Sequence, residues 1–60
     1  MNQRELARKK RVNSILEILK QAKAEDREID YRKLRFEIMF EYGCTSRTAK
    51  EYIDTAMTLI

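Results

Sequence analysis

The 60-residue sequence contains no histidine, proline or tryptophan, and only one glycine and one cysteine. Without histidine, and with Cys44 as the single thiol, the chain can build neither a zinc site nor an internal disulfide bond. A reactive thiol needs an activating base or a cationic pocket, so we expect Cys44 to be a small apolar residue of the core. The carboxylates lie among basic neighbours, and no isolated pair suits acid–base catalysis. We therefore expect no enzyme, no cofactor and no metal site.

Long apolar segments are also missing. No run approaches the ~18 residues that a membrane-spanning helix needs, and the N-terminus is polar rather than signal-like. We expect a soluble, cytoplasmic protein, associated with the nucleoid if the source is prokaryotic. A domain of this size buries only ~60% of the surface that its unfolded chain exposes, so it is marginally stable alone. Pairing with another chain becomes an alternative source of stability.

What the sequence does have is apolar residues that recur at intervals of three and four, with almost no helix breakers between them. This pattern predicts an all-α fold, a three-helix bundle. The first helix is expected over residues 3–24, where Asn2 and Glu5 resemble a capping box, and residues 25–29 form the connection. One stripe of this helix is assigned to the core: Val12, Ile15, Leu16, Leu19 and Ala22.

The second helix is expected to begin after Asp30. Asp30 is a good N-cap residue, and Ile29 and Leu34 on either side of it occupy the two positions of a hydrophobic staple. One stripe of this helix is assigned to the core: Tyr31, Leu34, Ile38 and Tyr42.

Residues 43–53, GCTSRTAKEYI, combine a sharp stop with the start of a short third helix. Gly43 permits the left-handed backbone that ends one helix, and Thr45 can cap the next. The third helix is expected from Ser46 to about Thr58. Its inward positions are Ala49, Tyr52, Ile53, Ala56, Met57 and Ile60, and its outward positions are Arg47, Lys50, Glu51, Asp54 and Thr58.

Residues 12–60 resemble the tri-helical core of helix-turn-helix and winged-helix DNA-binding domains, without a wing. In that family an apolar residue, a glycine, a small buried residue and a Ser/Thr cap follow one another. Tyr42, Gly43, Cys44 and Thr45 match in that order. The resemblance implies a helix-turn-helix formed by the second and third helices. Met39 stands where many members carry a small residue, so the two helices are expected to be splayed or rotated.

The resemblance also implies that the exposed start of the third helix reads base edges in the major groove of double-stranded DNA. The implied recognition residues are Ser46, Arg47, Thr48, Lys50 and Glu51. Thr48 is expected to hold phosphate, or alternatively only to support the helix start. For Arg47 and Lys50 the alternative is ordinary solubilising charge.

Positive charge is concentrated at the N-terminus. Residues 1–11 hold five basic residues and one acidic residue, whereas residues 12–60 hold eight basic and nine acidic residues. Such a basic extension, continuing into the first helix, suits a phosphate backbone, and a solvated helix end is the alternative. The residues expected to contact the DNA backbone are Arg4, Arg8, Lys9, Lys10 and Arg11, with Arg32, Lys33 and Arg35 from the second helix.

Phe36 and Phe40 lie on nearly the opposite side of the second helix from its core stripe. They are either core beneath the long first helix or an interface, and we favour a homodimer that presents two recognition helices to successive half-sites. The main expectation is a helix-turn-helix DNA-binding protein, a transcription regulator or DNA-binding accessory subunit acting as a dimer. The alternative is a protein–protein interaction module whose partner docks on Phe36, Phe40, Leu59 and Ile60.

Overall fold

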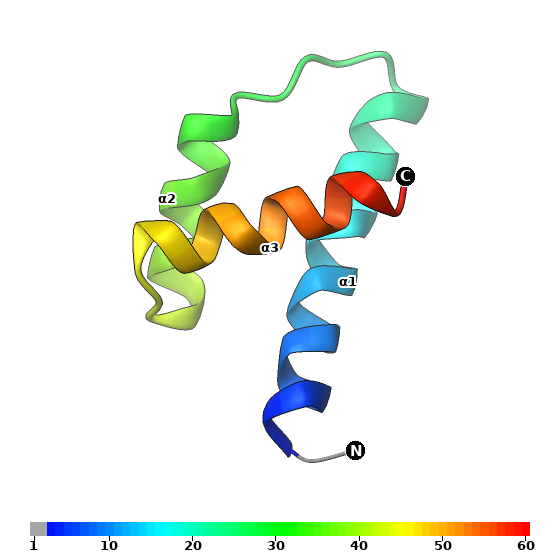
Figure 1. The fold of residues 1–60 in the computed structure, drawn as a ribbon. Helices are drawn as coiled ribbons and strands as arrows, with labels where there is room; N and C mark the ends of the chain where they lie inside the picture. The colour runs from blue at the N-terminus through cyan, green and yellow to red at the C-terminus, as the bar shows by residue number, and fades with distance from the viewer. Residues whose placement is uncertain (1–2) are drawn as a thin grey trace.

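The fold consists of three helices (Figure 1). A computed structural model describes residues 3–60, which form α1 (Gln3–Ala24), α2 (Tyr31–Tyr42) and α3 (Ser46–Thr58) and contain no strand. The prediction of an all-α three-helix bundle is confirmed, and so are the expected bounds of its helices. The expected cap at Asn2 lies outside the described residues. No helix in the described range is long and apolar enough to cross a membrane.

The third helix is the central element of the bundle. It packs against both α1 and α2, whereas across residues 3–60 the backbones of α1 and α2 do not approach each other closely. In Figure 1, α3 crosses α1, and the first turns of α1 extend beyond this crossing. The longest dimension of the molecule, 36 Å, is close to the ~33 Å length of a 22-residue helix. Long α1 therefore sets the shape, and α3 holds the other two helices together.

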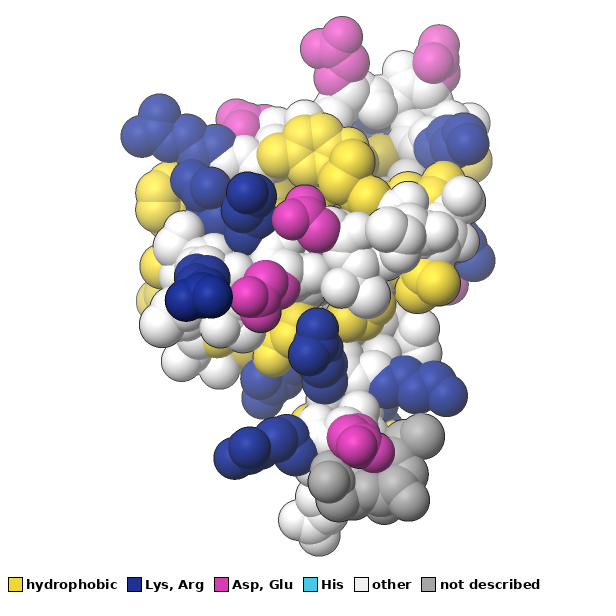
Figure 2. Space-filling model, viewed as in Figure 1, with side chains coloured by type: hydrophobic (Ala, Val, Ile, Leu, Met, Phe, Trp, Pro, Cys, Tyr) yellow, Lys and Arg dark blue, Asp and Glu magenta, His cyan; other side chains and the backbone are white. Residues whose placement is uncertain are grey.

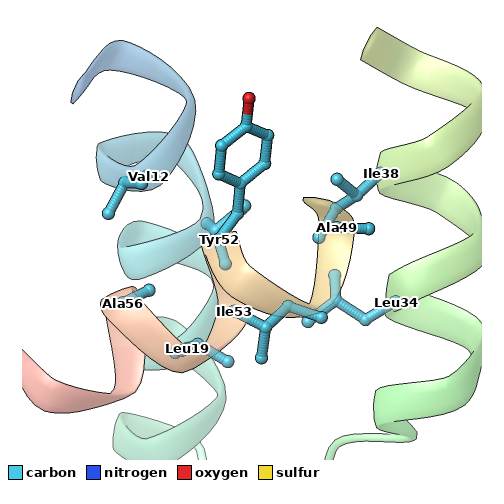
Figure 3. Close-up of a cluster of buried hydrophobic side chains, with 9 residues drawn as sticks. Val12, Leu19, Leu34, Ile38, Ala49, Tyr52, Ile53 and Ala56 are labelled. Carbon is cyan, nitrogen blue, oxygen red and sulfur yellow. The ribbon is translucent and has the colours of Figure 1, made fainter. Parts of the chain in front are cut away.

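The core lies along the two contact lines of α3 (Figure 3). Ala49 and Ala56 are completely buried, and because each side chain is a single methyl group, α3 can approach its neighbours closely. All the buried residues had been assigned inward positions from the sequence. They are Val12, Ile15, Leu19 and Ala22 from α1, Leu34 and Ile38 from α2, and Ala49, Tyr52, Ile53 and Ala56 from α3.

The first helix ends in a hydrogen-bonded reversal that the sequence did not predict. Asp26 adopts a left-handed backbone with φ of 55°. The N–H of Arg27 donates to the carbonyl oxygen of Ala22 at 2.8 Å, and the N–H of Asp26 donates to that of Lys23 at 3.1 Å. This pattern is a Schellman motif, which glycine usually forms. Aspartate tolerates the left-handed region better than most residues, so the chain can turn here without glycine.

The second helix begins and ends as predicted. The Asp30 side chain accepts a hydrogen bond from the backbone N–H of Lys33 at 3.1 Å, which confirms the N-cap. Ile29 is half-buried against the core that contains Leu34, as the expected hydrophobic staple requires. At the other end Gly43 has φ of 62°, the left-handed conformation that ends the helix.

Three expected core residues are more exposed than predicted. Tyr31 is 45% exposed, Met57 is 45% exposed and Ile60 is 50% exposed. Tyr31 lines two open grooves, one beside Leu19 and Ile60 and the other beside Met57. The assignment was wrong because the backbones of α1 and α2 do not approach each other closely, which leaves these side chains beside open grooves.

The remaining apolar residues of the predicted stripes lie at the edge of the core. Leu16, Met39 and Tyr42 are half-buried and pack against the buried cluster. Cys44 is also half-buried there, with its Sγ atom 3.8 Å from the carbonyl oxygen of Ile38. The thiol is thus part of the packing beneath the turn between α2 and α3.

Candidate nucleic-acid interface

The start of α3 is fixed by its N-cap. The side-chain oxygen of Thr45 accepts a hydrogen bond from the backbone N–H of Thr48 at 3.2 Å, and the Thr45 hydroxyl donates to the Thr48 hydroxyl at 3.1 Å. The predicted cap is therefore confirmed. Thr48 is half-buried, and its hydroxyl already takes part in the cap. This bonding favours the interpretation in which Thr48 supports the helix start.

An exposed ridge follows this cap along α3. Ser46, Arg47, Lys50 and Glu51 are all exposed, as expected from the sequence. The Arg47 side chain is 90% exposed, and its Nε atom lies 3.7 Å from Oε1 of Glu51. A surface pair of this length contributes little to stability. The Arg47 guanidinium is consequently available for new hydrogen bonds.

One side of the ridge is bordered by the basic N-terminal turns of α1. A groove between α1 and α3 has Thr48, Glu51 and Tyr52 on the α3 wall, and its α1 wall consists of Gln3, Arg4, Glu5, Ala7, Arg8 and Arg11. The fold thus brings the N-terminal basic segment beside the predicted recognition residues, although the two are far apart in the sequence.

Arg11 joins all three helices at this groove. Its Nη1 atom donates a hydrogen bond to the Tyr52 hydroxyl at 3.3 Å, and its guanidinium carbon lies 4.9 Å from the centre of the Tyr42 ring. A cation over an aromatic face at this distance is attracted by the ring. Sequence reasoning expected Arg11 to contact the DNA backbone and missed both tyrosines, because no local pattern links α1 to α2 and α3.

The other side of the ridge is bordered by basic residues of α2. A second groove is lined by Arg32 and Arg35 of α2 and by Lys50, Asp54 and Met57 of α3, together with Tyr31 and Ile53. The Nε atom of Arg35 is buried and finds no hydrogen-bond partner within residues 3–60. Arginine therefore borders the α3 ridge on both sides.

Not every predicted contact residue joins this face. Lys9 and Lys10 are exposed but line neither of the two grooves beside α3. Lys33 lies on another surface of α2, in a shallow groove with Phe36 and Phe40. The described structure thus places part of the expected basic set beside α3 and part away from it, and Arg32 lines a groove on each side.

The apolar residues expected to form one interface also separate. Phe36 is 52% exposed and Phe40 is 93% exposed, so the interpretation of these rings as core is wrong. Leu59 and Ile60 are exposed as well, but Ile60 lines a groove with Leu19 near the connection between α1 and α2. The phenylalanines and the C-terminal residues therefore belong to different surfaces.

Figure 2 shows the face that carries α3, with basic side chains on both sides of the helix and acidic side chains between them.

Comparisons of the chain with protein-family models, with curated proteins and with solved structures return no match. The function has to be inferred from the chain's own residues.

Proposed function

We propose that the protein binds double-stranded DNA, with the N-terminal half of α3 in the major groove, as a transcription regulator or DNA-binding accessory subunit. One observation carries this proposal: an exposed helix start is bordered on both sides by arginine-lined grooves. The major groove is ~12 Å wide and lies between two phosphate backbones, so it admits a helix and offers phosphates on either side of it.

Different residues of this face suit base contacts and phosphate contacts. Arg47 and Lys50 have the donors that recognise guanine O6 and N7, while Glu51 can accept from cytosine N4. These residues and Asp54 leave the α3 ridge balanced in charge, so attraction to DNA must come from its flanks. Arginine residues of α1 and α2 occupy those flanks and suit phosphate contacts, which position a protein without reading sequence.

The test is fluorescence-anisotropy binding to a mixed pool of DNA duplexes over a series of salt concentrations. The variants are Arg47→Ala on the ridge, Arg8→Ala on the α1 flank and Arg32→Ala on the α2 flank. Lys20→Ala is the matched control, because Lys20 is an exposed basic residue of α1 that lines neither groove beside α3.

We expect each flank variant to weaken binding and to reduce the log–log salt slope by about 0.9, the loss of one phosphate contact. Arg47→Ala should reduce the preference for a selected site, and Lys20→Ala should leave binding unchanged. Absence of binding at low salt would refute DNA binding. Equal weakening by Lys20→Ala and Arg8→Ala would show that only overall charge matters.

A further inference from the structure

The outward surface of α2 carries a second, chemically distinct face. Phe36 and Phe40 are exposed there, and a shallow groove beside them is also lined by Asp30, Arg32, Lys33, Glu37 and Glu41. The largest apolar patch on a protein surface is often functional, so this pair of rings is a candidate interaction surface. We name this surface, made of these seven residues, the α2 outer face.

The charges on the α2 outer face follow a fixed order along the helix. Lys33, Glu37 and Glu41 are spaced by four residues, so they form one row on a flank of the phenylalanines. Lys33, the basic member of this row, lies near the start of α2, where Arg32 and the N-cap Asp30 also line the groove, and the two acidic members lie toward the end of the helix. Within residues 3–60 none of the three takes part in an ion pair. The row therefore has a basic end and an acidic end. Its charges are available to pair with a second row that runs in the opposite direction.

We propose that the α2 outer face binds the same face of a second copy of this chain, with the two α2 helices antiparallel. In a two-fold dimer a residue i of one copy contacts a residue j of the other while j contacts i, so the surface must complement itself. Reversing the direction of the row brings its basic end to its acidic end. The apolar pair lies between these ends and meets an identical pair.

The spacing along α2 supports this arrangement. With the two-fold axis at the level of Ile38, Phe36 of one copy lies at the level of Phe40 of the other. Lys33 then lies two residues, or about 3 Å of helix rise, from the level of Glu41 in the second copy, a distance that its side chain can span. Glu37 comes equally near Glu37 of the second copy, so this central pair is repulsive.

The aromatic area of the α2 outer face supplies part of the interface that a stable dimer needs, and the charged flanks must supply the rest. From the exposed fractions of Phe36 and Phe40, each copy offers roughly 300 Å² of aromatic surface, taking about 200 Å² for a whole side chain. Two copies thus contribute roughly 600 Å², about half of the ~1,200 Å² at the lower end of specific interfaces, before the charged flanks are counted. Burying this surface against a second copy would also stabilise a domain of only 60 residues, which is marginally stable alone.

The experiment measures mass by sedimentation equilibrium, without DNA, over a range of protein concentrations. We expect the intact protein to reach twice its chain mass of 7.2 kDa, and Phe40→Glu to remain at one chain mass. Lys33→Glu and Glu41→Lys should each weaken dimerisation by about tenfold, since each removes two symmetry-related ion pairs and adds repulsion. The double variant should recover the original dimer, and Glu37→Gln should tighten it.

Lys20→Glu is the control for a charge reversal at an exposed helix position outside the α2 outer face, and circular dichroism confirms that each variant remains helical. A monomeric intact protein at millimolar concentration would overturn the proposal. A dimer that Phe40→Glu leaves intact, or that the double charge exchange does not restore, would overturn it as well. Pairing is measured without DNA, and Arg8 and Arg47, whose variants test DNA binding, lie outside the α2 outer face, so failure of this test and failure of the DNA-binding test are separate results.

Discussion

Replacing Arg11 with methionine should destabilise the bundle, because it removes the group that joins all three helices. The lost hydrogen bond to Tyr52 is worth about 1 kcal/mol, and the lost contact with the Tyr42 ring is worth about 0.5–1 kcal/mol. Methionine keeps most of the aliphatic packing, so we expect a net loss of about 1 kcal/mol, which lowers Tm by ~4–8 °C in a domain of this size.

The measurement is thermal unfolding followed by circular dichroism at one fixed protein concentration, since association makes Tm depend on concentration. Arg8→Met is the matched control, because Arg8 is an exposed arginine one turn earlier in α1. Tyr52→Phe removes only the hydroxyl partner. If the Arg11 hydrogen bond stabilises the fold, Arg11→Met and Tyr52→Phe should be non-additive in the double variant.

Two outcomes would refute this account of Arg11. One is an equal effect of Arg11→Met and Arg8→Met on Tm, and the other is strict additivity of Arg11→Met with Tyr52→Phe. The salt dependence of DNA binding gives an independent readout. A fall in slope of about 0.9 for Arg11→Met would show that Arg11 holds a phosphate, as the sequence alone suggested.

Two further predictions concern the turn between α2 and α3. Gly43→Ala should lower the free energy of unfolding by about 1 kcal/mol in urea denaturation, because an L-residue is strained at φ of 62°. No atom lies within 4 Å of the added Cβ, so a much larger loss would contradict a purely conformational cause. Thr45→Ala should cost about 1 kcal/mol through loss of the cap, while Thr45→Ser should retain most of the stability in the same assay. Equal losses in the two Thr45 variants would contradict the capping role.

The helix boundaries were predictable because their causes are local. Asp30 and Thr45 bond to backbone groups three residues away, and Gly43 takes a conformation that few other residues accept. Periodicity of apolar residues likewise located the core positions. The left-handed turn at Asp26 was not predicted, because aspartate occurs in many other local structures and does not by itself indicate this conformation.

The arrangement of the helices was less predictable, because it depends on contacts between distant residues. Nothing in the sequence indicates that α1 and α2 stay apart, which is why Tyr31 and Met57 were wrongly assigned to the core. The position of Arg11 between two tyrosines has the same origin. For the candidate site, the exposed start of α3 was readable from the sequence, but the grooves on its two sides required the fold.

The central place of α3 also bears on how the chain folds. The contacts of α3 with α2 join neighbouring segments, whereas those with α1 close a long loop and cost more chain entropy. The α2–α3 pair is thus the unit that can form early, with α1 docking onto it afterwards. Because the first turns of α1 extend past the crossing with α3, their amide hydrogens should exchange before those of the central helix. The two basic flanks of α3 would then differ in order of assembly: the α2 flank forms together with α3, and the α1 flank forms last.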